Sequence, residues 1–147
     1  IIVLQILSRS VQAQKSNLLP SGFYGVTATK DIKNAFLLRT QNTYYLPQAE
    51  NYLPLGFIDS IYDESSNAYL TVNFVLKALY KQDLFSFTRL FQNQDVGLLV
   101  NGELLLVAHI VEPIANGSIA YSGSFDKAHV KHIESSVNFA LKKEYRK

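Results

Sequence analysis

Two apolar runs joined by an Asn-Gly pair constrain the fold of this chain more than any other feature of its sequence. Residues 96–100 and 104–111 are almost continuously apolar, and Asn101 and Gly102 stand between them. This pair suits the tight turn of a β-hairpin, because both central residues of that turn need a positive φ. We therefore predict an antiparallel hairpin. Because both faces of its strands are apolar, we expect it at the centre of a sheet or covered on both sides.

Further strands are expected on either side of this hairpin, from β-branched and aromatic content and from polar-apolar alternation. They cover residues 23–29, 36–38, 44–46, 69–74 and a segment that starts at residue 57, with turn formers at residues 40–43 and 63–67. After Pro113, the pair Asn116-Gly117 marks another turn. It leads into an alternating segment that runs up to Gly123 and completes the sheet.

Two segments change to a helical period, with an apolar residue at every third or fourth position. The first stripe is Leu76, Tyr80, Leu84, Phe87 and Phe91, and the second is Val130, Ile133, Val137, Ala140 or Leu141, and Tyr145. Asp126 is placed to cap the second helix. The sequence therefore predicts an α+β fold, in which two amphipathic helices pack on an antiparallel or mixed β-sheet.

The composition limits the class of partner and of chemistry. A chain of 147 residues with 48% hydrophobic content can build one well-buried domain. It has no cysteine, so disulfides and thiolate metal sites are excluded. Its net charge of +2 is too small to favour nucleic acid as a partner.

The first residues resemble an export signal. Residues 1–7 are apolar, and Val11 and Ala13 stand like the small residues before a signal-peptidase site. We interpret residues 1–14 as a clipped signal peptide, 15–21 as a linker and 22–147 as a single domain that is exported to the periplasm or secreted. The alternatives for the apolar run are a first strand or a loose tail. At this length it does not reach the span of a bilayer, so we expect no integral membrane span.

Residues that could carry catalysis or bind a metal have simpler interpretations. His129 and His132 are three apart on the second helix, but a third ligand is missing, which favours surface histidines. His109 falls within a strand, where a hydrogen-bonded histidine is the simpler interpretation. The carboxylates occur mostly at turns, and no nucleophile or phosphate-binding motif is present. We predict neither enzyme activity nor a metal or cofactor.

Two surface features could contact a polypeptide or a protein partner. One is the aromatic group Tyr44, Tyr45 and Tyr52, because tyrosine offers contact area at low entropic cost, although core packing explains some of these residues equally well. The other is the expected hairpin tip, Asn101, Gly102 and Glu103. Residues with structural turn or cap roles are Asn116, Gly117, Gly123 and Asp126.

The chain carries, in this order, the runs 83–88, 96–104, 112–117 and 121–125. Their order and spacing resemble the head subdomain of the first periplasmic domain of the protein-export subunit SecD, or fused SecDF. In that family a threonine-bearing helix leads to an apolar strand, a D-G-K hairpin tip, a second strand, an I-x-x-G turn, an I-S-G-x-F segment and a closing helix. The resemblance covers roughly residues 35–141. The matching residues are Thr88, Asn101-Gly102, Gly117, Gly123 and Phe125, and the departures are Asn101 for Asp, Glu103 for Lys, and Ala108-His109 for Ala-Pro.

The resemblance implies an α+β head that contacts polypeptide emerging from the translocation channel and moves relative to a base subdomain. Neither that base nor a transmembrane helix is found here, so we do not expect coupling to a proton gradient. Our leading hypothesis is an exported, non-catalytic binding module. The alternatives are a structural domain that self-associates through a sheet edge, and a small hydrolase in which a histidine meets a carboxylate and a hydroxyl.

Overall fold

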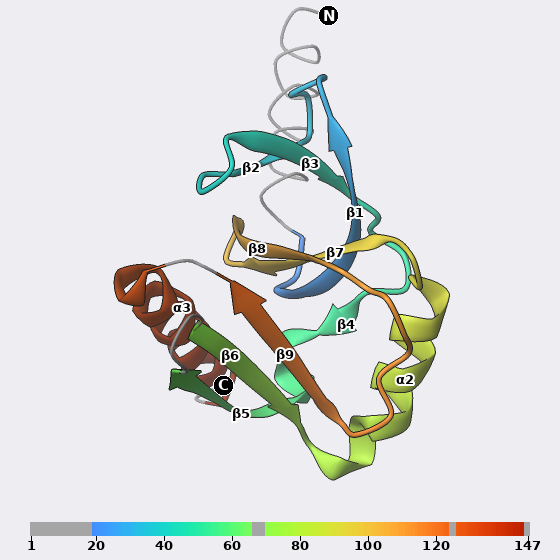
Figure 1. Ribbon diagram of the computed structural model, residues 1–147, viewed down its shortest axis with the longest axis vertical. Helices are drawn as coiled ribbons and strands as arrows, with labels where there is room; N and C mark the ends of the chain where they lie inside the picture. Colours follow the sequence, from blue (N-terminus) through green and yellow to red (C-terminus); the bar gives the residue numbers. More distant parts are fainter. Residues whose placement is uncertain (1–18, 66–69, 124–125, 146–147) are drawn as a thin grey trace, which may run out of the picture.

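The computed structural model describes residues 19–65, 70–123 and 126–145, and in them it shows two antiparallel sheets with two α-helices (Figure 1). The expected signal peptide, residues 15–18 of the expected linker, and Phe125 lie outside the described residues. The larger sheet has the strand order β2-β3-β1-β7-β8, and β4 also pairs with β1. Its strands are β1 (Gly22–Thr29), β2 (Phe36–Leu38), β3 (Thr43–Pro47), β4 (Leu53–Pro54), β7 (Asp95–Val100) and β8 (Glu103–His109).

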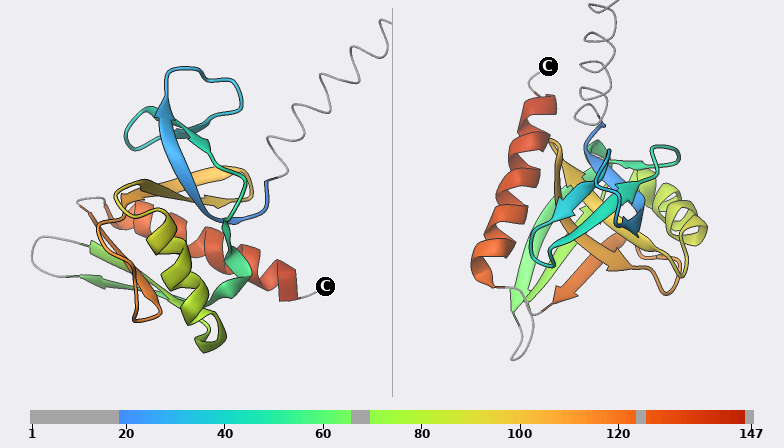
Figure 2. Two further views of the ribbon diagram at one scale, coloured as in Figure 1. Left: turned by 90° about the vertical axis from the view of Figure 1, so that its right-hand side faces the viewer. Right: turned by 90° about the horizontal axis from the view of Figure 1, so that it is seen from above.

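The smaller sheet contains β5 (Ile58–Ser65), β6 (Leu70–Leu76) and β9 (Ser118–Gly123), in that order. This corrects the expectation of one sheet, because the last strand pairs with β6 instead of extending the β7–β8 hairpin. The helices α2 (Lys81–Leu90) and α3 (Lys127–Tyr145) lie on opposite sides of the strands (Figure 2). Two short 3-10 helices are also present: η1 (Leu55–Phe57) connects β4 to β5, and η2 (Ala78–Tyr80) connects β6 to α2.

The β7–β8 hairpin has the predicted turn. Asn101 and Gly102 adopt φ angles of 49° and 80°, and Val100 pairs with Glu103 across them. The pairing register shifts between Leu98 and Leu99, which marks a β-bulge. Both faces of β7 are buried, as predicted, because Leu98 and Leu99 belong to different core clusters.

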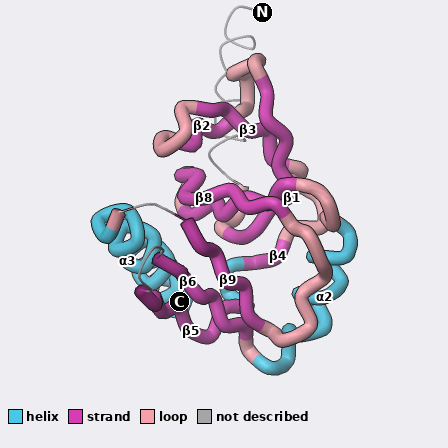
Figure 3. The backbone as a smooth tube through the Cα atoms, viewed as in Figure 1, coloured by secondary structure: helices cyan, strands magenta, loops and turns pink. Residues whose placement is uncertain are grey.

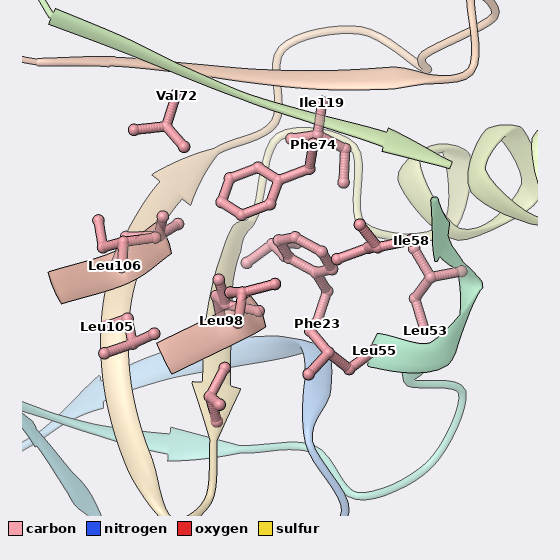
Figure 4. Close-up of a cluster of buried hydrophobic side chains, with 14 of the residues drawn as sticks. Phe23, Leu53, Leu55, Ile58, Val72, Phe74, Leu98, Leu105, Leu106 and Ile119 are labelled. Carbon is pink, nitrogen blue, oxygen red and sulfur yellow. The ribbon is translucent and has the colours of Figure 1, made fainter. Parts of the chain in front are cut away.

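The larger of these clusters fills the space between the two sheets and the helices (Figure 4). Phe23 from β1 meets Phe74 from β6 edge to face, with ring centroids 5.4 Å apart. The smaller cluster lies inside the curl of the six-stranded sheet, whose edge strands β2 and β8 come close together. Its buried residues are Tyr24, Val26, Leu38, Tyr45, Leu99 and Leu104.

The first helix differs from its predicted bounds at its start. Leu76 lies in β6 and Tyr80 in η2, so α2 begins only at Lys81. The 3-10 turn mimics a helical period, and there Tyr80 stacks on Phe57 with ring centroids 3.7 Å apart. In α3 the predicted apolar stripe from Val130 to Leu141 is buried.

One buried threonine ties α2 to the long connection between β8 and β9, which runs past this helix (Figure 3). The Thr88 hydroxyl donates to the Leu84 carbonyl at 2.9 Å and accepts a hydrogen bond from the Ile114 backbone N–H at 2.8 Å. Its role here is structural, because it satisfies a main-chain donor of a loop.

Candidate functional site

The hairpin tip is held from two sides. The Asn101 backbone N–H donates to the hydroxyl of Ser21, the residue before β1, at 2.9 Å. On the other side, Glu103 Oε2 lies 2.9 Å from His132 Nε2 on α3. A carboxylate can only accept, so His132 donates. The tip is therefore a fixed surface, and a Cβ added at Gly102 would meet nothing within 4 Å.

An open groove of about 410 Å³ lies between this tip and α3. We call it the tip groove, and it is lined by Val100, Asn101, Glu103, Ser135, Ser136 and Phe139. Phe139 is 65% exposed, which is unusual for an aromatic ring on a helix. The groove therefore combines an apolar anchor point with a carboxylate, an amide and two hydroxyls.

The three tyrosines do not form one exposed patch, which corrects that expectation. Side chains alternate along β3, so Tyr45 points into the smaller cluster and is only 8% exposed, while Tyr44 is half-buried. Burial raises the pKa of the Tyr45 hydroxyl, with a further contribution from Asp95. Tyr52 stacks on Tyr24, with ring centroids 4.9 Å apart. Core packing thus accounts for much of this group.

Tyr52 also contributes to a second open groove, of about 400 Å³, between α2 and the β4 region. We call it the α2 groove. Its lining is Asn51, Tyr52, Leu53, Pro54, Phe57, Asp83, Ser86, Phe87 and Leu90. Leu90 is 53% exposed at its rim. Two of the predicted contact regions, the tip and Tyr52, therefore lie in two different grooves.

The turn and cap residues have these surroundings. The Asn116 side-chain oxygen accepts a hydrogen bond from the Ser118 N–H at 3.0 Å, and Gly117 has a φ of 80°. Gly123 pairs with Leu70 at the end of β9. The Asp126 carboxylate accepts a hydrogen bond from the His129 N–H at 2.9 Å, which is the geometry of a helix N-cap.

His109 lies beside a carboxylate, but it does not line either groove. Its Nδ1 lies 3.0 Å from Asp95 Oδ1, and the two side chains are 56% and 39% exposed. Neither residue lines the tip groove or the α2 groove. Within the described ranges, no cluster of three or more histidine, aspartate or glutamate side chains comes together that could hold a metal ion.

A carboxyl pair links α3 to the smaller sheet. Asp63 and Glu64 lie within β5, which corrects their expected position in a turn. Burial raises the pKa of Glu134, and its hydrogen bond with Asp63 and the charge of Asp63 raise that pKa further. Lys131 acts in the opposite direction. Neither carboxyl residue is among those that line either groove.

Sequence reasoning missed the α3 side of the tip groove. Phe139 lies off the apolar stripe of that helix, and a large aromatic residue on the polar face was an available signal. Ser135 and Ser136 carried no such signal. The contact between His132 and Glu103 joins residues 29 positions apart, so only the packing of α3 against the hairpin creates it.

Comparison with known proteins gives a fold but no family. No family model and no curated protein matches this chain. A crystal structure of SecDF in a super-membrane-facing form matches over 91% of this chain, with a TM-score of 0.50 and 12% identity. The match covers 20% of the SecDF chain. The chain therefore has a SecD-like α+β fold. Within the described residues, no helix has the length and apolarity needed to cross a membrane.

Proposed function

We propose that this domain is a non-catalytic binding module, similar to the SecD periplasmic head, which contacts an unfolded polypeptide on its outer surface after export. The observation that carries the proposal is the tip groove, where the exposed Phe139 ring stands beside a hairpin tip that is held in place. Exposed aromatic residues next to satisfied polar groups are typical of the anchor points of protein interfaces. The SecD-like fold supports the assignment to export or surface assembly.

The geometry of the tip groove suits an extended chain better than a small molecule. The groove is open to solvent between the tip and α3, and its polar lining offers both donors and acceptors. Ser135, Ser136 and Asn101 can exchange hydrogen bonds with a peptide backbone, while Phe139 covers an apolar side chain. Such contacts tolerate many sequences, as a polypeptide-handling domain requires.

Fluorescence anisotropy with labelled, unstructured peptides tests this function. Phe139→Ala removes the anchor ring from the surface, and we expect it to weaken binding about tenfold. The matched control is Leu79→Ala, which removes a side chain that is 79% exposed on η2, away from the groove. Binding that is equally strong in both variants and in the unaltered protein would show that the polypeptide docks elsewhere.

Self-association through a sheet edge is a second candidate, favoured by the contrast between the edges of the smaller sheet. On β5 the exposed residues include Asp59, Asp63 and Glu64, which discourage edge pairing, whereas on β9 the exposed Ala120 and Ser122 are uncharged. Light scattering that reports a concentration-independent dimer, lost in Ala120→Lys, would support this candidate. A monomer at all concentrations would exclude it.

A further inference from the structure

The charge pattern of the tip groove identifies the kind of side chain that it accepts. Among its six lining residues, Glu103 is the only charged one. Its side chain is 41% exposed, so it reaches both solvent and the groove. The hydrogen bond from His132 engages Oε2 of this carboxylate and holds it at the edge of the groove. A held carboxylate beside an open groove favours a cationic partner.

The aromatic ring complements that carboxylate. Lysine and arginine carry a long aliphatic stem below the charge, and a ring can cover this stem or the cation itself. Phe139 lies on the α3 side of the groove and Glu103 on the hairpin side. Ser135 and Ser136 add hydroxyl oxygens that can accept the remaining N–H bonds of an ammonium or guanidinium group.

We propose that the tip groove binds a lysine or arginine side chain of the polypeptide, with Glu103 pairing its charge and Phe139 covering its stem. This inference rests on the proposed polypeptide-binding function and adds a selection for basic segments. Lys142 and Lys143 follow Phe139 on α3 but are not among the lining residues. They would attract acidic residues to the helix end, so the test includes an acidic peptide.

The test compares three labelled peptides that differ at one central residue, which is arginine, its neutral isostere citrulline, or glutamate. We expect the arginine peptide to bind about tenfold more tightly than the citrulline peptide at low salt. This ratio should shrink as salt is added, because the groove is open to solvent. Glu103→Gln should lower the ratio to the part that the Phe139 ring contributes, about two- to fivefold.

The matched control is Glu112→Gln, which makes the same chemical change beyond the opposite end of β8, and it should keep the ratio unchanged. Glutamine still accepts the hydrogen bond from His132, so circular dichroism should show an intact fold in both variants. Equal binding of the arginine and citrulline peptides, with both weakened by Phe139→Ala, would overturn the basic selection but keep the proposed function. Tighter binding of the glutamate peptide would also overturn it. Failure of all three peptides to bind would overturn both proposals.

Discussion

Replacing Thr88 with valine tests the physical account of the fold at one hydrogen bond. Valine keeps the shape of the side chain and removes the hydroxyl. The Leu84 carbonyl loses little, because in an α-helix it also accepts from the backbone N–H of residue 88. The Ile114 N–H loses its acceptor at 2.8 Å. An unsatisfied buried donor costs about 1–3 kcal/mol, and Ile114 is only half-buried, so we expect about 1–2 kcal/mol.

Urea denaturation measures this loss, and amide hydrogen exchange identifies its origin. Thr88→Ser is the control, because it keeps the hydroxyl but removes a buried methyl group, which costs about 1 kcal/mol. Both variants therefore lose stability, but only the valine variant should lose protection at the Ile114 amide, by about tenfold relative to the serine variant. An Ile114 amide that exchanges equally slowly in both variants would refute the reasoning.

Three further predictions concern stability. Gly25→Ala should lower the free energy of unfolding, measured by urea denaturation, by about 1–3 kcal/mol, because its Cβ would lie 2.1 Å from a ring carbon of Phe91. A loss below about 0.5 kcal/mol, the size of a surface effect, would contradict this close packing. Gly102→Ala should cost about 1 kcal/mol through its positive φ alone, and Gly102→Asn should cost less; equal losses would argue against that backbone geometry. Because the pKa of Glu134 is raised, the folded state favours its protonated form. The stabilisation of the fold by this form is complete below the usual pKa of 4.5 and is lost as the pH rises through the raised value. Glu134→Gln should therefore have the higher melting temperature at pH 8 and lose this advantage below pH 4.5, and an advantage that is constant with pH would be inconsistent with the shift.

Local signals in the sequence predict much of the fold. The Asn101-Gly102 turn requires only two residues with positive φ, and the apolar stripe of α3 requires only one helical face, so both follow from neighbouring residues. Division into two sheets could not be predicted in the same way. Whether β9 pairs with β6 or β8 depends on contacts between distant segments, which the local pattern of a strand does not specify.

The candidate site was likewise predictable from the sequence only in part. Asn101, Gly102 and Glu103 are recognisable as an exposed tip, because turn chemistry places them at a hairpin end. The burial of the tyrosine group was not predictable, because the strand pattern does not indicate which face of β3 packs against the core. Tyr45 belongs to the smaller cluster. The tip groove exists only where α3 packs against the hairpin, so its lining had to come from the structure.

The proposed function requires that a polypeptide docks between the hairpin tip and α3. Titration of the isotopically labelled protein with the arginine peptide, followed by nuclear magnetic resonance, locates the docking site. Chemical shift changes should concentrate at residues 100–103 and 135–139, with little change along β9. Changes that instead follow β9 or the α2 groove, while residues 100–103 and 135–139 stay unaffected, would contradict the claim.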